Sequence, residues 1–297
     1  MYFLSRYRRG IFNRYRKGMP VSEMFLKDSA VAFRKLLDAL QSKKRKTLLA
    51  YPHFPSRGST LYQIARSLGW EVTNSMDRSF ELALHWEYAT VREEFGPLEG
   101  IEHVRVINLH CRDISKDVVD EQMESAFGYS TRIDPSNFQG IAVKKSLQNA
   151  VHDGQAVQCP CDPEEGVIYQ RLIDSSVNER EVMDLRVPVI GGAIPHLYLN
   201  YRRNAERFKN VPDRSELCKD VSSKLSSEEV AQIIGFCTLA GLEFCELDVL
   251  RDCEDHRIYI VDANNTPQGP PKHLSEKDKP VAIDSLSKAF QLAFIPA

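Results

Sequence analysis

Short alternating or apolar runs separated by polar turns recur along this 297-residue chain and predict a mixed α/β protein. In the clearest pair, the run Leu242–Leu250 and the run Ile258–Val261 flank the polar residues 251–257, as in a β-hairpin. The second run ends in Asp262-Ala263-Asn264, so the side chains of Asp262 and Asn264 point to one face of the strand. The hairpin brings Asp248 opposite them.

These three side chains place hard oxygen ligands on one face of the predicted hairpin. Mg²⁺ prefers a few carboxylate or amide oxygens together with substrate phosphates. Asp248, Asp262 and Asn264 are therefore candidate ligands for one or two Mg²⁺ ions. An ordinary edge hairpin with solvated acidic residues explains these residues equally well.

Earlier in the chain, an open α/β sheet is predicted. Thr47–Tyr51 forms a buried strand, the loop PHFPSRGST follows it, and Ser59 or Thr60 caps a helix that Gly69 ends. The runs WEVT and VRVINL predict further strands, and residues 80–95 predict a strand followed by a helix. Ligands of open α/β sheets gather beyond the carboxyl ends of the strands. Substrate contacts are thus expected at His53, Arg57, Ser59 and Thr60, although the loop can also be a plain connector.

A basic segment opens the chain. Residues 1–46 contain 13 Lys and Arg against 3 Asp and Glu, and the apolar spacing over Val21–Leu40 predicts a helix. Such an arm can contact an acidic partner, RNA or a membrane surface. The favoured interpretation is a helical arm with a solvated basic face that packs on its own body or on a twin subunit, which predicts a homodimer.

Composition narrows the class of protein. The formal net charge of −2 gives no reason to expect DNA binding, and no apolar run is long enough for a transmembrane segment. The first residues lack the apolar core of a signal peptide, so a soluble, cytoplasmic protein is expected. Seven cysteines, an odd number, indicate reduced thiols, and Cys159 and Cys161 lack a second close pair that would complete a zinc site.

Candidate phosphate ligands follow a predicted strand at Ile141–Val143, which delivers Lys144 and Lys145 into a polar loop. A lysine ammonium suits phosphate because it is a point charge that needs no fixed geometry. The loop has a single glycine, Gly154, so it is not a P-loop. Further strands are predicted at Val167–Asp174 and from Asp184 towards a Gly-Gly turn.

The order of these segments resembles the ATP-grasp superfamily, in particular its ribosomal-protein glutamate ligase and glutathione synthetase branch. The resemblance covers about residues 116–271 and rests on DLRVPVIGG, YLNYRR and the Asp248…Asp262-x-Asn264 series, where Asp262 replaces the usual Glu. It implies an α/β protein with an ATP-grasp fold after an open α/β pre-ATP-grasp lobe. The implied domains are a basic helical arm (1–46), the pre-ATP-grasp lobe (47–115) and the ATP-grasp domain (116–297), with a small lobe at about 116–178 and a large metal-binding lobe at about 179–297.

The resemblance also implies site residues for ATP and Mg²⁺. Arg186, with Arg202 or preferably Arg203, would neutralise the transferring phosphoryl group, because a guanidinium fork matches phosphate oxygens. Surface ion pairs are the alternative for these arginines. The implied nucleotide contacts are Lys116, Lys144, Lys145 and the hinge residues Gln170, Arg171, Leu172, Ile173 and Asp174.

The implied activity is ATP-dependent ligation of a small-molecule or peptide carboxylate to an amine through an acyl phosphate. Two alternatives remain: a kinase of the same fold that phosphorylates a small hydroxyl compound, and a nucleotide-binding module without turnover. Amine-dependent ADP release would indicate the ligase, amine-independent phosphorylation the kinase, and ATP binding without hydrolysis the module.

Overall fold

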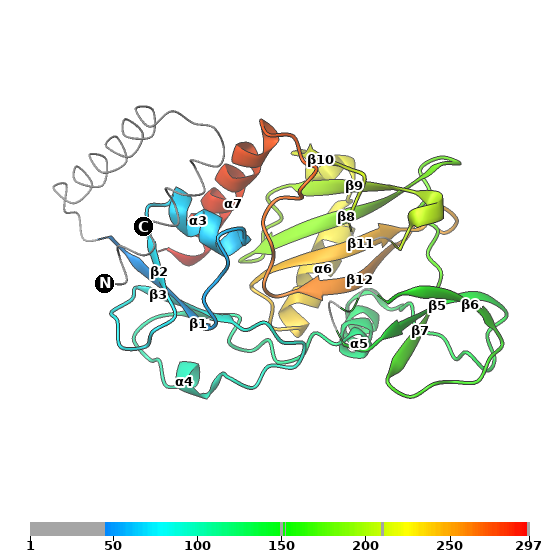
Figure 1. Cartoon of the computed structure of the whole chain (residues 1–297), viewed down its shortest axis with the longest axis horizontal. Helices are drawn as coiled ribbons and strands as arrows, with labels where there is room; N and C mark the ends of the chain where they lie inside the picture. Colours follow the sequence, from blue (N-terminus) through cyan, green and yellow to red (C-terminus); the bar gives the residue numbers. More distant parts are fainter. Residues whose placement is uncertain (1–44, 149–150, 152, 209–210, 296–297) are drawn as a thin grey trace, which may run out of the picture. The chain divides into compact units, whose positions relative to one another are not determined.

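The computed structural model describes residues 45–148, 151, 153–208 and 211–295. The chain divides into a unit of residues 1–45 and a unit of residues 46–297, and the elements of the second unit are shown in Figure 1. Residues 1–44 of the basic segment, including the helix predicted at Val21–Leu40, lie outside the described residues. Within the described residues, no helix is both long and apolar enough to cross a membrane.

A parallel four-stranded sheet begins the second unit, in the order β2-β1-β3-β4. Its strands are β1 (Thr47–Pro52), β2 (Glu71–Thr73), β3 (Leu82–Trp86) and β4 (Val106–Ile107). Helices α3 (Thr60–Ser67) and α7 (Asp278–Phe294) pack against each other, and their apolar residues join Leu48 and Ala50 in one core. Leu49 and Ala83 pack separately with Leu98 of α4 (Gly96–Glu99), because successive strand residues face opposite sides.

Helix α3 begins and ends as predicted. The hydroxyl of Ser59 accepts a hydrogen bond from the backbone N–H of Tyr62, and Gly69 adopts the left-handed φ of +71° that follows the helix end.

The helix predicted before residue 95 is wrong. Residues 87–95 instead run beside residues 111–114, where the backbone N–H of Arg92 donates to the carbonyl of Arg112 at 2.7 Å. The carboxylate of Glu87 also accepts the backbone N–H of Glu94 at 3.3 Å, which satisfies a donor that a helix would otherwise use. Only the short α4 forms, with a proline in its first turn.

The second sheet is antiparallel, in the order β10-β9-β8-β11-β12. Helices α5 (Lys116–Phe127) and α6 (Ser227–Leu239) pack together, and their apolar residues form the main core with one face of this sheet (Figure 1). The strands are β8 (Glu181–Ile190), β9 (Leu197–Arg203), β10 (Arg214–Cys218), β11 (Phe244–Arg251) and β12 (Ile258–Asn264), with 3₁₀ turns η1 (Asn204–Glu206) and η2 (Val221–Ser223).

This sheet is amphipathic. On β8 the core side chains are Leu185, Val187 and Val189, and the intervening Asp184 and Arg186 face the other way. The same alternation on β9, β11 and β12 gathers polar residues on the face that α5 and α6 do not cover. A polar sheet face bordered by other elements is a natural place for a ligand.

The third sheet has three antiparallel strands in the order β6-β5-β7: β5 (Gly140–Ser146), β6 (Gln155–Cys159) and β7 (Val167–Arg171). Strand β5 is longer than predicted, so Lys144 and Lys145 lie on the strand and not in the following loop. Their side chains therefore point to opposite faces.

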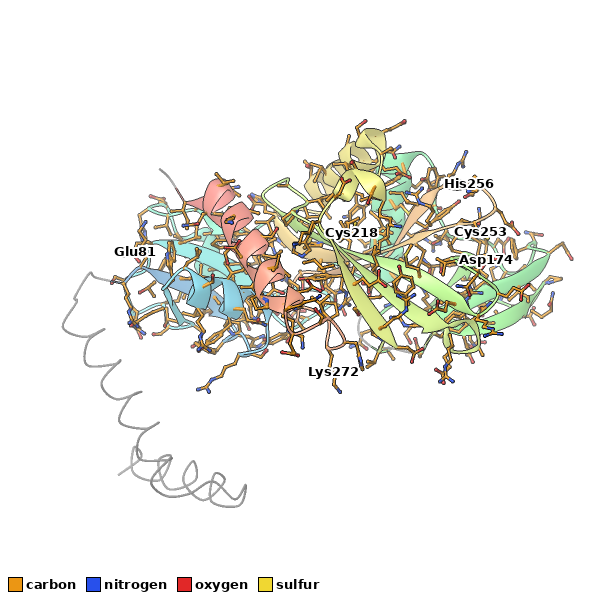
Figure 2. All side chains as sticks on the ribbon, turned by 90° about the horizontal axis from the view of Figure 1, so that it is seen from above. Glu81, Asp174, Cys218, Cys253, His256 and Lys272 are labelled. Carbon is orange, nitrogen blue, oxygen red and sulfur yellow. The ribbon has the colours of Figure 1, made fainter. Side chains whose placement is uncertain are left out.

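The seven cysteines all lie in the described part of the chain and are free thiols. Cys218 ends β10 and Cys253 lies in the turn between β11 and β12, as Figure 2 labels them. The sulfur atoms of Cys159 and Cys161 lie 3.8 Å apart, and those of Cys237 and Cys245 lie 3.9 Å apart.

His196, directly before β9, is a buried histidine. It is 1% exposed, its ring lies 4.7 Å from that of Tyr198, and neither ring nitrogen has a partner among the described residues. Burial lowers the pKa of His196 to about 4. Between pH 6.5 and 4 the unfolded chain therefore binds a proton that the folded chain does not, so acid lowers stability in this window.

We expect His196→Phe to remove part of this acid sensitivity. The pKa difference corresponds to about 3 kcal/mol of unfolding free energy lost between pH 6.5 and 4. Denaturant unfolding at pH 7 and pH 4.5 should show a smaller loss in the variant than in the unsubstituted protein. The control is His103→Phe at an exposed residue, and equal acid losses in all three proteins would contradict the prediction.

Candidate active site

A cavity of about 500 Å³ lies over the polar face of the five-stranded sheet and is bordered by β5 and β7. Ten of the residues expected to bind ATP, metal or phosphoryl group line it: Lys145, Gln170, Arg171, Leu172, Ile173, Arg186, Arg202, Asp248, Asp262 and Asn264. The structure thus brings together residues from six strands, and from the segment after β7, that lie up to 119 positions apart in the chain.

The candidate metal ligands lie on neighbouring strands. Asp248 of β11 pairs directly with Asp262 of β12, and the next pair on the same face is Glu246 with Asn264. A register shift follows Asp248, so that Val249 pairs with Ile260 and Val261 is the extra residue. The bulge keeps Val249 and Ile260 in the core, whereas Asp262 and Asn264 line the cavity.

The electrostatics of Asp262 fit a divalent cation. Burial raises the pKa of Asp262 to about 6, although the positive charge of Lys116 opposes the shift; Asp248 raises it further. Within the described residues, no cationic group lies within ion-pair distance of the Asp262 carboxylate, which accepts only the backbone N–H of Ala263. A half-buried carboxylate beside another carboxylate suits a bound cation, and the oxygen-only donor set suits Mg²⁺.

Two arginines lie on the same polar face of the sheet as these acids. The Nε of Arg186 lies 3.1 Å from Oδ1 of Asp248 and 3.3 Å from Oε1 of Glu246, and Asp248 raises the pKa of the guanidinium. The Nη1 of Arg202 pairs with Oδ1 of Asp184. The two guanidinium groups therefore place positive charge directly beside carboxylates on the polar face of the sheet.

Arg203, the preferred arginine of the sequence analysis, lies elsewhere. It follows Arg202 on β9, so its side chain points to the opposite face of the sheet. Its side chain is 67% exposed and pairs with Glu206 at 2.7 Å. Arg203 does not line the cavity, and the structure places Arg202 there instead.

The same alternation separates the two lysines of β5. Lys145 lines the cavity, and burial lowers its pKa to about 8, with Asp262 opposing the shift. Lys144 does not line the cavity and pairs with Glu164 at 2.8 Å. The ammonium of Lys116, at the start of α5, donates to the carbonyl of Gln148 at 3.2 Å; it is not a lining residue, but its charge reaches Asp262.

We therefore expect Lys145→Ala to weaken Mg·ATP binding by about tenfold, because one charge-assisted phosphate contact is lost. Lys144→Ala should change the dissociation constant less than about twofold, since its partner is an exposed glutamate. Isothermal titration calorimetry on both variants is the measurement. Equal losses, or a larger loss in Lys144→Ala, would contradict the orientation of β5.

The hinge residues form the cavity wall between β7 and β8. Gln170 is 3% exposed, and its Oε1 has no hydrogen-bond partner among the described residues. Leu172 and Ile173 add an apolar surface beside it. One unsatisfied amide oxygen next to apolar side chains suits a flat polar ring such as a purine base.

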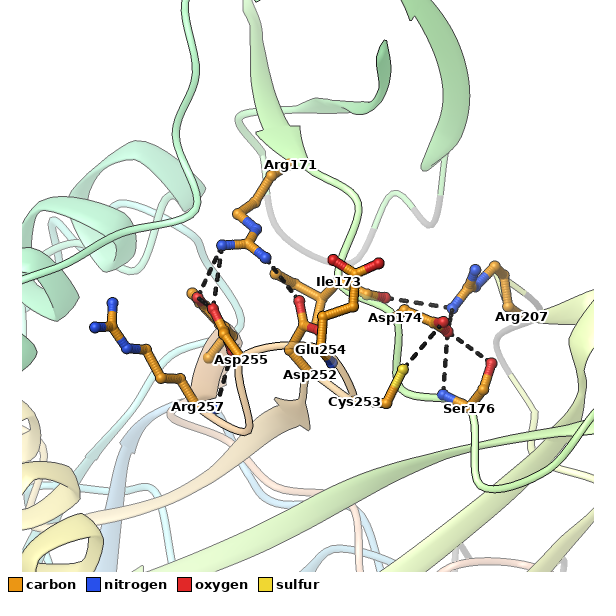
Figure 3. A network of polar contacts seen from close by, with 11 residues as sticks. Arg171, Ile173, Asp174, Ser176, Arg207, Asp252, Cys253, Glu254, Asp255 and Arg257 are labelled. Atoms are coloured by element: carbon orange, nitrogen blue, oxygen red, sulfur yellow. Dashed lines mark hydrogen bonds and ion pairs between the residues drawn. The ribbon is translucent and has the colours of Figure 1, made fainter. Parts of the chain in front are cut away.

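The turn between β11 and β12 contacts this hinge (Figure 3). The guanidinium of Arg171 contacts Asp252 at 2.8 Å, Asp255 at 3.3 Å and the hydroxyl of Tyr259 at 3.0 Å. The Asp174 carboxylate accepts hydrogen bonds from Ser176, Cys253 and Arg207, and the Ser176 hydroxyl lowers its pKa. Asp174 is therefore committed to this network and is absent from the cavity wall.

None of the four expected substrate residues lines the cavity. Ser59 caps α3, the hydroxyl of Thr60 accepts the backbone N–H of Gly269 at 2.9 Å, and Nδ1 of His53 accepts the backbone N–H of Tyr88 at 3.0 Å. Arg57 is exposed. Their loop still borders the site, because the hydroxyl of Ser56 bonds Gln268, a lining residue, at 3.1 Å.

Sequence reasoning missed the remaining lining residues. Glu246 and Asp184 were within reach, since each lies two positions from a predicted site residue on the same strand. Lining residues on loops do not follow the two-residue repeat of a strand, so the sequence pattern does not indicate them. The missed residues are Thr131, Val143, Ser175, Val182, Asp184, Arg207, Phe208, Glu246, Leu250, Val261, Thr266 and Gln268.

Comparison with known proteins gives the fold. No protein-family model matches the chain, and no curated protein does. A D-alanine–D-alanine ligase from Bacillus anthracis is 12% identical with a TM-score of 0.51 over 84% of this chain and 95% of the ligase. The same ligase complexed with ATP is 13% identical, with a TM-score of 0.51 over 84% of this chain and 96% of the ligase.

The ATP-grasp ligase PsnB, complexed with a phosphomimetic variant of its minimal precursor, Mg and ADP, is 14% identical, with a TM-score of 0.38 over 59% of this chain. This chain spans 58% of that ligase. The likeness to the D-alanine–D-alanine ligase confirms the fold class predicted from the sequence: the chain has the ATP-grasp fold.

Proposed function

We propose that this chain is an ATP- and Mg²⁺-dependent ligase that joins a carboxylate to an amine through an acyl phosphate. The observation that carries the proposal is the cavity itself, where the paired Asp248 and Asp262 face Arg186, Arg202 and Lys145. Phosphoryl transfer requires acidic ligands for a metal ion and cationic groups for the phosphates, and this cavity holds both. The ATP-grasp fold of the chain supports the assignment.

Each part of ATP has suitable partners along the cavity. Leu172, Ile173 and the amide of Gln170 offer a slot for the base, and Lys145 offers its ammonium to the phosphates. Asp248, Asp262 and Asn264 would hold Mg²⁺. When bound, the ion would neutralise phosphate charge and orient the terminal phosphoryl group.

The chemical step moves the terminal phosphoryl group of ATP to a carboxylate oxygen of the substrate, and ADP is the leaving group. The amine then attacks the acyl carbon, and inorganic phosphate leaves. Arg186 and Arg202, both held by carboxylates, would stabilise the negative charge that spreads over the phosphoryl oxygens. Apolar wall residues, Val143, Val182 and Phe208, would keep water from the labile acyl phosphate.

The test is ADP release from Mg·ATP against a panel of carboxylates and amines, including peptides. We expect release to require a carboxylate and to rise with the amine, and hydroxylamine to trap the activated acyl group. With ¹⁸O in the substrate carboxylate, one labelled oxygen should appear in the released phosphate. Stable phosphorylation of a hydroxyl compound without an amine would favour the kinase alternative, and ATP binding without turnover would favour a non-catalytic module.

A further inference from the structure

Glu246 adds a second carboxylate to Arg186, and the proposed chemical step does not use it. Arg186 of β8 pairs across the sheet with Asp248 of β11, and Glu246 lies two residues before Asp248 on the same face. A single donor, the Nε–H of Arg186, thus faces two acceptors: it donates a hydrogen bond to Asp248 and lies 3.3 Å from Glu246.

Arg186 is the one cationic group within ion-pair distance of Glu246 in the described part of the chain. Glu246 is only 2% exposed, and a buried carboxylate without a cationic partner is strongly unfavourable. The neighbouring Tyr198 does not relieve it, since its buried hydroxyl has no hydrogen-bond partner among the residues that the structure describes. The interaction of Glu246 with Arg186 therefore accounts for the placement of an acid in the sheet face.

The carboxylate of Asp248 takes part in two interactions in this proposal. It is the hydrogen-bond acceptor of Arg186, and it is a candidate metal ligand that faces Asp262. A divalent cation at Asp248 withdraws electron density from the carboxylate and repels the nearby guanidinium. Arg186 then needs another anion if it is to stay over the cavity.

We propose that Glu246 is a positioning residue that holds Arg186 over the cavity once a metal ion occupies Asp248. The inference rests on the proposed function, because it assumes a metal at Asp248. It assigns to Glu246 a role that is small without metal, when Asp248 is available to Arg186, and large with metal. A residue that only stabilises the fold would not show this dependence.

A double-mutant cycle tests the proposal without measuring activity. Glu246→Gln, Arg186→Met and the double variant are unfolded by denaturant in EDTA and in saturating Mg²⁺. We expect the coupling between the two residues, expressed as a ratio of unfolding equilibrium constants, to be about tenfold larger with Mg²⁺. The control cycle, Glu229→Gln with Arg251→Met, uses an ion pair at 2.7 Å that also involves β11, and its coupling should not respond to Mg²⁺.

Kinetics supply the second readout. Glu246→Gln should lower kcat by about 10²-fold, as expected for a misplaced catalytic group, with little change in KM for ATP. In the Arg186→Met background, Glu246→Gln should lower kcat no further. An equal loss of kcat in that background would overturn the proposal, because Glu246 would then act without Arg186. Calorimetric titration with Mg²⁺ distinguishes a failure of the metal site from a failure of this inference. If Mg²⁺ does not bind, both the metal site and this inference are wrong. If Mg²⁺ binds but the coupling between Glu246 and Arg186 does not depend on it, only this inference is wrong.

Discussion

Asp262→Ala is expected to lower the rate of ADP production by at least about 10²-fold and to abolish Mg²⁺-dependent nucleotide binding, in a protein that remains folded. The reason is geometric: Asp262 is paired with Asp248 across the hairpin, and its loss leaves Asp248 as the one carboxylate among the proposed metal ligands. Stability without metal should be unchanged or higher, because burial raises the pKa of this carboxylate and therefore disfavours its charged form in the folded state.

Three measurements on purified protein check this result: ADP release, calorimetric titration with Mg·ATP, and thermal unfolding in EDTA. The control is Asp284→Ala, which removes an exposed acid of α7 that pairs only with Lys288 among the described residues. Asp262→Glu should keep measurable activity, because it adds one methylene and retains the charge. Normal turnover in Asp262→Ala would show that the metal ligands lie elsewhere.

Arg202→Ala should reduce kcat by about 10²- to 10³-fold, with a smaller effect on ATP binding, because its contact strengthens as charge develops on the transferring phosphoryl group. Arg203→Ala should change kcat less than about threefold. The two residues have identical side chains and adjacent positions, so the comparison isolates the face of β9 on which the guanidinium lies. Arg202 lines the cavity, and Arg203 is exposed and bound to Glu206.

Steady-state kinetics and direct ATP binding are measured on both variants. Arg202→Ala also removes the partner of Asp184, a buried carboxylate whose pKa is raised by that burial, so some loss of stability is expected. The double variant Asp184→Asn, Arg202→Ala should regain stability without regaining rate, which separates the two effects. A large kcat loss in Arg203→Ala, matching that in Arg202→Ala, would contradict the site described for this cavity.

The elements with strong local signals were predicted well. The hairpin of β11 and β12, the cap at Ser59 and the end of α3 near Gly69 depend on short-range periodicity, a side-chain hydrogen bond and a left-handed glycine. The segment 87–95 was predicted wrongly because its pattern suits a helix in isolation. Its backbone donors are satisfied by distant partners instead, such as the Arg112 carbonyl.

What the sequence by itself determined is the ATP-grasp fold class and the composition of the site: an acid pair with an amide, neighbouring lysines and neighbouring arginines in a fixed order. Strand alternation also requires that Lys144 and Lys145, like Arg202 and Arg203, point apart. Only the tertiary structure decided which member of each pair faces the cavity, because that depends on which face of each sheet packs against its neighbours. The structure also decided the place of Glu246, whose partner Arg186 lies 60 positions away in the chain and is brought beside it by the pairing of β8 with β11.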